Sequence, residues 1–95
     1  MASAYILYSK KGDSYYVGVT TESATSRLHK HNNSIYGNHF TSKATDWQLR
    51  LEIGCENFSE ARKIELYIKG MKSRKFIEKL IGNDEEIERL KRSVE

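Results

Sequence analysis

A chain of 95 residues is long enough for one small domain and too short for a second hydrophobic core. Hydrophobic residues make up 38% and aromatic residues 11%, which suits a folded domain better than a disordered chain. No apolar run approaches the roughly 20 residues that span a bilayer, and no signal-peptide pattern is found. The single Cys55 excludes an internal disulfide, so we expect a soluble, cytoplasmic domain that does not enter a membrane.

The formal charge of +3 is distributed unevenly along the chain. Residues 62–79 carry seven basic side chains against two acidic ones, whereas residues 80–95 carry five acidic side chains against three basic ones. A concentrated positive segment attracts phosphate backbones, and a solvated helix face produces the same pattern. Nucleic acid is therefore a candidate partner, with ordinary surface charge as the alternative.

Two segments near the N-terminus have the composition of paired strands. Residues 4–9 and 15–20 are rich in aromatic and β-branched side chains, and the polar residues between them include Gly12. Together they predict a β-hairpin.

The length of the hairpin loop decides which side chains share a face. A two-residue loop places Tyr5 opposite Gly18 and Leu7 opposite Tyr16. Because side chains alternate along a strand, these four then lie on the same face. A loop of odd length would separate Tyr5 from Tyr16.

A helix is expected after the hairpin, followed by a polar loop over residues 34–46. Ser23 is a suitable N-cap, and Arg27, Leu28 and His31 follow the spacing of one helical face. That face packs against a sheet, so its cation and imidazole either reach the rim or line a polar pocket.

Residues 47–53 alternate strictly between apolar and polar side chains and predict a third strand. Asn57 or Ser59 then caps a helix that ends near Gly70. Its apolar stripe consists of Ala61, Ile64, Ile68 and Met71.

Two shorter helices are expected at the end of the sequence. Ser73 caps the first, which Gly82 stops, and a capping box at residues 83–86 begins a charged helix that runs to about Arg92. The predicted fold is α+β, with a small three-stranded antiparallel sheet flanked by three to four helices.

Glu65 lies at the edge of the apolar stripe, half turned toward the core. A carboxylate in that position needs a partner or a metal, because an unpaired buried charge is costly. An ion pair with a neighbouring Lys or Arg is the structural alternative. Zinc is disfavoured, because His29 and His31 point about 160° apart on a helix and no Cys pair exists.

Two triplets, an Arg–His helix and a later Glu occur in a fixed order. The triplets are Ser3-Ala4-Tyr5 and Tyr16-Val17-Gly18, the first helix carries Arg27 and His31, and a later helix carries Glu65. This ordered set resembles the GIY-YIG nuclease superfamily. The first triplet keeps only the Tyr of its signature, and the second is a close match.

The resemblance covers about residues 4–81 and is greatest to short stand-alone bacterial members. Those proteins are similar to the N-terminal nuclease domain of excinuclease C. The resemblance implies a nuclease domain over residues 1–82 and a charged helical tail over residues 83–95. It does not imply a target sequence, because no long DNA-recognition region of the kind found in homing enzymes is present.

The resemblance implies a metal-dependent endonuclease, a hydrolase that cuts DNA with selectivity for its structure in repair or recombination. The implied catalytic side chains are Tyr5, Tyr16, Arg27, His31 and Glu65. Glu65 would hold one Mg²⁺ or Mn²⁺ ion, since a hard cation prefers oxygen ligands. Arg27 suits the phosphate, and the choice of general base among Tyr5, Tyr16 and His31 stays open.

DNA is the expected partner, bound through the polar loop and the basic helices. The candidate contacts are His39, Thr41, Lys43, Lys69, Lys72, Arg74 and Lys75. The apolar positions of the last helix, Ile87, Leu90 and Val94, leave three alternatives: packing on the domain, a homodimer or a protein partner. A nucleic-acid-binding module with little or no cleavage is the alternative function.

Overall fold

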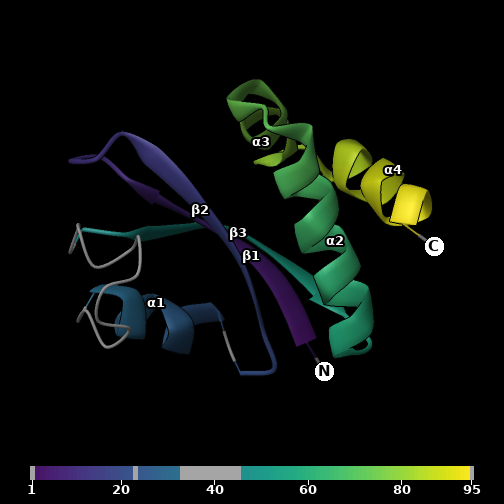
Figure 1. The fold of residues 1–95 in the computed structure, drawn as a ribbon, viewed down its shortest axis with the longest axis horizontal. Coiled ribbons are helices and arrows are strands. Elements are labelled where there is room, and N and C mark those ends of the chain that lie inside the picture. Colours follow the sequence, from purple (N-terminus) through teal and green to yellow (C-terminus); the bar gives the residue numbers. More distant parts are fainter. Residues whose placement is uncertain (1, 23, 33–45, 95) are drawn as a thin grey trace.

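The computed structural model describes residues 2–22, 24–32 and 46–94, apart from the side chains of residues 30 and 31 (Figure 1). Within these ranges the chain forms three strands and four helices, which confirms the predicted α+β class. In chain order they are β1 (Ala2–Ser9), β2 (Ser14–Thr20), α1 (Ala24–Asn32), β3 (Gln48–Cys55), α2 (Phe58–Met71), α3 (Arg74–Leu80) and α4 (Asp84–Val94).

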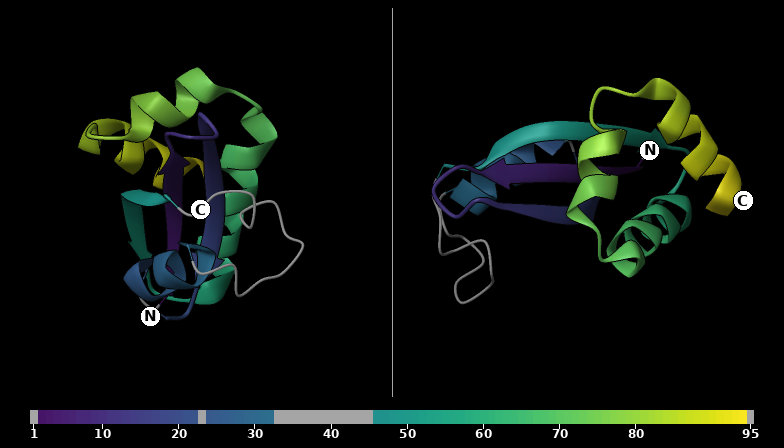
Figure 2. Two further views of the ribbon diagram at one scale, coloured as in Figure 1. Left: turned by 90° about the vertical axis from the view of Figure 1, so that its left-hand side faces the viewer. Right: turned by 90° about the horizontal axis from the view of Figure 1, so that it is seen from above.

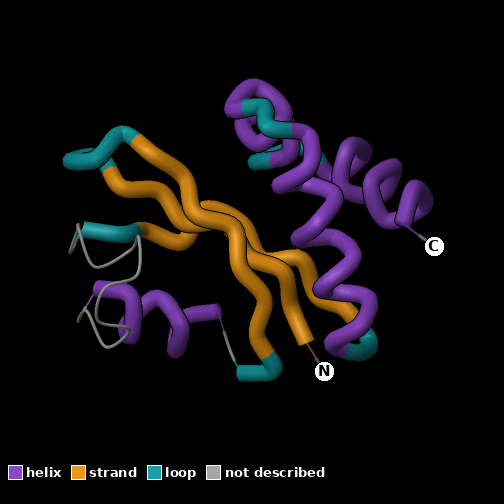
Figure 3. The backbone as a smooth tube through the Cα atoms, in the orientation of Figure 1, coloured by secondary structure: helices purple, strands orange, loops and turns teal. Residues whose placement is uncertain are grey.

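The three strands form one antiparallel sheet in the order β2-β1-β3, and the strands are visibly twisted (Figure 3). The register between β1 and β2 is the predicted one, with Tyr5 opposite Gly18 and Leu7 opposite Tyr16. The hairpin turn spans residues 10–13, and the Asp13 amide donates to the Lys10 carbonyl at 3.3 Å.

The register between β1 and β3 changes part-way along the pair. Ile6 lies opposite Leu51, whereas Leu7 lies opposite Leu49, so Arg50 is an extra residue in a β-bulge. Strict alternation predicts Leu49 and Leu51 on one face. That prediction is wrong, because the bulge shifts the alternation by one residue and sends the two side chains to opposite faces.

Helices cover both faces of the sheet (Figure 1). One face packs against α2, α3 and α4 and forms the larger core, which we call the main core; it consists of Ala2, Ala4, Ile6, Val17, Ile53, Cys55, Ala61, Ile64, Ile68, Leu80 and Leu90. The other face packs against α1 and forms a smaller cluster, which we call the aromatic face; it consists of Tyr5, Leu7, Ala24 and Trp47, with Tyr16, Leu28 and Leu49 against them.

The N-terminus of α2 is capped by Asn57, one of the two residues that the sequence left open. The Asn57 side chain accepts a hydrogen bond from the Glu60 amide at 2.9 Å. The helix ends at Met71, next to the predicted break at Gly70, and Lys72 takes the left-handed conformation (φ 49°) with its amide bonded to the Lys69 carbonyl.

The apolar stripe of α2 is one residue shorter than predicted. Ile64 and Ile68 are fully buried against the sheet, whereas Met71 is 45% exposed. Met71 lies in the last turn of α2, so the prediction that it joins the core is wrong.

The last helix packs on the domain, which is one of the three alternatives for its apolar positions (Figure 2). Leu90 is 3% exposed in the main core, and Ile87 and Val94 pack against the same core. Its start is capped by Asn83, whose side chain accepts from the Glu86 amide at 3.2 Å. Among the described residues, no helix combines the length and apolar character that crossing a bilayer requires.

Candidate active site

The two signature tyrosines lie side by side on the aromatic face. The ring centroids of Tyr5 and Tyr16 are 6.3 Å apart, and the Trp47 ring packs on Tyr16 at a steep angle with the two centroids 6.4 Å apart. Tyr5 is 1% exposed, whereas Tyr16 is half-buried on the outer strand β2. Of the two phenols, Tyr16 is therefore the one more open to solvent.

The ring of Tyr5 lies over Gly18, so this position has no space for a larger side chain. A Cβ added at Gly18 would come 2.6 Å from the Tyr5 hydroxyl oxygen and 2.7 Å from its ring carbon Cζ. A glycine opposite Tyr5 could leave room for a substrate to approach, but the Tyr5 side chain fills that room.

Helix α1 is fixed to the sheet at both of its ends. The Ala24 amide at its start donates to the Glu52 carboxylate at 3.4 Å, and Glu52 lies opposite Tyr5. At its end the Asn32 side chain accepts from the Trp47 amide at 2.6 Å and donates to the Trp47 carbonyl at 3.0 Å. These contacts set the height of α1 above the two tyrosines.

Arg27 lies on this fixed helix and is half-buried. Its Nη1 atom is 3.8 Å from Glu22 Oε1, just before the helix. The neighbouring Leu28 packs against the aromatic face. The side chain of His31, the other predicted residue of α1, lies outside what the structure describes, as does the predicted cap at Ser23.

Glu65 is buried in α2, with only 4% of its surface exposed. Arg62 donates from Nη1 to its Oε1 atom, and Lys69 donates from Nζ to its Oε2 atom at 2.9 Å. Both partners come from the same helix, one turn before and one turn after. The structure therefore contains the ion-pair arrangement that the sequence left as an alternative.

Lys69 connects Glu65 to the tyrosines. Its ammonium nitrogen lies 5.9 Å from the centroid of the Tyr16 ring, over the edge strand of the sheet. Tyr5, Tyr16, Lys69 and Glu65 thus form a continuous series of contacts that draws on β1, β2 and α2.

A groove of about 430 Å³ runs beside Tyr16, between β2 and the junction of α2 with α3. Val17, Ile68 and Ile77 supply apolar surface, and two exposed lysines, Lys69 and Lys72, supply positive charge. The remaining lining residues are Asp13, Ser14, Tyr15, Tyr16, Ser73 and Arg74.

The predicted DNA-contacting residues fall into three groups. Lys69, Lys72 and Lys75 are exposed on α2, on α3 or between the two helices. Arg74 is engaged with Asp13 and Glu78, so a phosphate would compete with two ion pairs for its guanidinium. The last group, His39, Thr41 and Lys43, lies outside the described residues.

A comparison with known protein families matches residues 1–79 to the GIY-YIG catalytic domain. The chain belongs to the GIY-YIG family. A search of curated proteins and a search of solved structures each returned no significant match. The matched GIY-YIG residues end in α3, and the following helix α4 contributes Leu90 to the same core.

The GIY-YIG family is a family of endonucleases that are generally dependent on a divalent metal, and a nuclease domain implies DNA as substrate. Among the described residues, no group of three or more His, Cys, Asp or Glu side chains gathers at one point.

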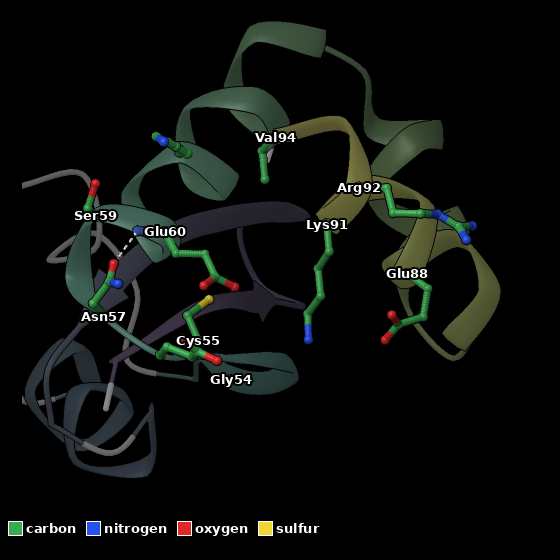
Figure 4. Close-up of a pocket in the computed structure, with 11 residues that line it drawn as sticks. Gly54, Cys55, Asn57, Ser59, Glu60, Glu88, Lys91, Arg92 and Val94 are labelled. Carbon is green, nitrogen blue, oxygen red and sulfur yellow. Dashed lines mark hydrogen bonds between the residues drawn. The ribbon is translucent and has the colours of Figure 1, made fainter.

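A second hollow, of about 890 Å³, lies at the start of α2 and beside α4 and shares no residue with the groove (Figure 4). Its charged lining is balanced, with three glutamates against Lys63, Lys91 and Arg92. Cys55 and Glu60 point toward each other there. The pKa of the Cys55 thiol is raised, mainly by burial and next by the negative charge of Glu60. Neither a phosphate nor a reactive thiol is favoured in this hollow.

Sequence reasoning missed three residues that contact members of the candidate site. Arg62 contacts Glu65, Glu52 caps α1, and Trp47 packs on Tyr16. The spacing of Arg62 from Glu65 on one helix carried the signal for that contact. The other two depend on the pairing of β3, which the bulge altered.

Proposed function

We propose that this GIY-YIG domain is a divalent-metal-dependent endonuclease that hydrolyses DNA phosphodiester bonds, with one Mg²⁺ or Mn²⁺ ion at Glu65. The observation that carries the proposal is the series of contacts from Tyr5 through Tyr16 and Lys69 to Glu65. It brings two phenols, an ammonium group and a carboxylate to one edge of the sheet.

The side chains have separate tasks in this proposal. A phosphodiester is anionic, so attack needs its charge neutralised and a nucleophile activated. Arg27 offers a planar fork of N–H donors to the phosphate oxygens. Tyr16, the more exposed phenol, orients the attacking water or takes its proton, and the buried Tyr5 fixes the ring of Tyr16 from behind. His31 is the alternative base.

Glu65 suits a hard cation by its chemistry and its position. Its two oxygen atoms are nearly buried and already hold two positive groups, Arg62 and Lys69. A single carboxylate leaves most of the coordination sphere to water and substrate phosphate, as Mg²⁺ prefers. Bound there, the ion supplies Lewis-acid neutralisation of the phosphate charge.

DNA binding in this proposal is electrostatic. Lys69, Lys72 and Lys75 contact the phosphate backbone from the groove and from α3, and the loop residues His39, Thr41 and Lys43 are further contacts. Contacts of this kind position the duplex without reading its sequence. We therefore propose recognition of DNA structure, in repair or recombination in the cytoplasm, in line with the resemblance to the excinuclease domain.

One observation favours a second function, a nucleic-acid-binding module with little or no cleavage. Both carboxylate oxygens of Glu65 are engaged by Arg62 and Lys69, so an ion must compete with them. If the ion pairs prevail, the basic surface remains and the metal-dependent chemistry is lost.

Cleavage of labelled DNA distinguishes the two functions. Single-stranded, duplex, nicked and branched substrates are incubated with Mg²⁺, Mn²⁺ or a chelator, using the wild type, Glu65→Gln and the same-helix control Glu60→Gln. The endonuclease proposal expects metal-dependent cleavage that Glu65→Gln abolishes and Glu60→Gln retains. Salt-sensitive binding without cleavage of any substrate would establish the binding module instead.

A further inference from the structure

The tip of the β1–β2 hairpin is tied to α3 by one guanidinium group. Arg74 donates from Nη2 to the Asp13 carboxylate at 2.6 Å and from Nη1 to the Asp13 carbonyl at 3.0 Å. Its Nε donates to the Glu78 carboxylate at 3.4 Å. Three donor atoms are therefore used within the domain, and the two that bond Asp13 join segments that are 61 residues apart in the sequence.

Two tyrosines complete this network from the sheet side. The Tyr8 hydroxyl donates to the Asp13 carboxylate at 2.8 Å, and the Tyr15 hydroxyl donates to the Glu78 carboxylate at 3.2 Å. The guanidinium carbon of Arg74 lies 5.3 Å from the centroid of the Tyr15 ring and 6.0 Å from that of Tyr8. Each carboxylate thus receives one bond from Arg74 and one from a phenol.

The electrostatics agree with a closed network. Hydrogen bonds from Arg74, then Tyr8, hold the pKa of Asp13 below its usual range, so the carboxylate stays charged at neutral pH. Arg74, Asp13 and Glu78 together carry a net charge of about −1 when all three are ionised. A phosphate approaching Arg74 would meet this negative pair, whereas Lys72 and Lys75 nearby are exposed.

The network forms part of the groove beside Tyr16. Asp13 and Tyr15 line it from the hairpin, and Arg74 and Ile77 line it from α3. The bond from Arg74 to Asp13 joins these two walls and fixes the distance between them. Tyr16 is the next residue after Tyr15 on β2, so it lies beside the joined walls.

We propose that Arg74 is a positioning residue that locks the hairpin tip to α3 through Asp13 and Glu78, sets the width of the groove beside Tyr16, and does not itself bind phosphate. The catalytic part of this inference rests on the proposed function. The lock itself can be tested without any cleavage.

The first measurement is a cycle of thermal unfolding with Arg74→Met, Asp13→Asn and the double variant. If the two residues act as one lock, the Tm shift of the double variant is no larger than that of the more affected single variant. Hydrogen exchange at the hairpin-turn amides becomes faster in all three variants, and most in the two that lack Arg74, because Asp13→Asn keeps the backbone carbonyl that accepts from Arg74. Additive Tm shifts, or unchanged exchange in the turn, would overturn the lock.

The second measurement uses Arg74→Lys and the salt dependence of DNA binding, with Lys75→Met as the matched control on α3. A lysine keeps the positive charge. It lacks the guanidinium fork that bonds both carboxylates, and it lacks the flat surface that lies over the Tyr8 and Tyr15 rings. We expect Arg74→Lys to behave like Arg74→Met, with a roughly 10- to 100-fold lower kcat and little change in KM. Neither variant should change the slope of log K against log salt. Lys75→Met should make this negative slope shallower by about 0.9, because one phosphate contact is lost.

A phosphate-binding role for Arg74 predicts the opposite pattern. Arg74→Met would then lower the salt slope by about 0.9, Arg74→Lys would restore it, and Asp13→Asn would not reduce kcat. If no DNA is cleaved, the proposed function fails, while the unfolding cycle, the exchange rates and the salt slope still decide on the lock.

Discussion

The two faces of the sheet differ in composition and in what they support. The face under α2, α3 and α4 is built from aliphatic side chains of three strands and three helices. The face under α1 is smaller, and Tyr5, Tyr16 and Trp47 dominate it. One face is a continuous apolar core, whereas the other contains hydroxyl groups close to charged residues at its rim.

This difference separates the stability of the domain from its proposed chemistry. Aliphatic burial is non-directional and supplies most of the folding free energy. Aromatic side chains with polar ends also need defined neighbours, such as the close fit of Tyr5 over Gly18. Substitutions in the two faces should therefore affect different measured quantities.

The largest expected effect is on the aromatic face, at Tyr16. Tyr16→Phe should lower the rate of DNA cleavage about 10²- to 10⁴-fold, because the phenol is the proposed proton-handling group. The free energy of unfolding should change by about 1 kcal/mol or less. Single-turnover cleavage and urea unfolding measure the two quantities, and Tyr67→Phe on exposed α2 surface is the control. Full activity in Tyr16→Phe would transfer the role to Tyr5 or His31.

The main core is tested at Ile64, which is fully buried. Ile64→Ala should cost about 2–5 kcal/mol of unfolding free energy, because it removes buried methyl groups and leaves a cavity. Leu66→Ala, two residues along and 52% exposed, should change stability by no more than about 0.5 kcal/mol. Equal losses from both variants, measured by urea unfolding, would contradict the assignment of stability to this face.

The fit between strands on the aromatic face is tested at Gly18. Gly18→Ala should cost about 1–3 kcal/mol, because the added Cβ displaces the ring of Tyr5. The control is Gly54→Ala in the same sheet, where an added Cβ meets nothing within 4 Å. Thermal unfolding should separate the two variants clearly. A Gly18→Ala domain as stable as the Gly54→Ala domain would show that Tyr5 moves without cost.

The smallest expected effect is acid sensitivity at the hairpin tip. Hydrogen bonds from the Ser9 hydroxyl, then the Lys11 amide, lower the pKa of Asp46. A carboxylate whose folded pKa is depressed stabilises the fold above its unfolded pKa, near 4, and this contribution disappears as the pH falls through the folded pKa. Unfolding measured from pH 7 to pH 3 should therefore show a shallower acid loss in Asp46→Asn than in wild type. Parallel curves would contradict the prediction.

Local patterns predicted much of the fold. The hairpin register followed from a short loop and strand alternation, and Asn57 and Ser73 were recognisable caps. The strands, the four helices and the buried positions Ile64 and Ile68 were predicted for the same reason. Each depends on residues close together in the chain, where spacing and propensity act directly.

The candidate site was only partly accessible from sequence. The edge position of Glu65 and its two possible kinds of partner could be read from helical spacing, but the choice of Arg62 and Lys69 needed side-chain positions. Arg74 was predicted as a phosphate contact on charge alone. Its ion pair with Asp13 joins residues 61 positions apart, and no local pattern indicates such a contact.

The sequence by itself determined the elements, their order, the hairpin face shared by Tyr5 and Tyr16, and the ordered residues of the family signature. Tertiary structure alone decided the bulge at Arg50, which divides Leu49 and Leu51 between the two faces, and the packing of α4 on the main core. The physical reason is that alternation and helical spacing are local properties. A bulge, an ion pair between distant segments and the burial of a helix depend on which surfaces meet.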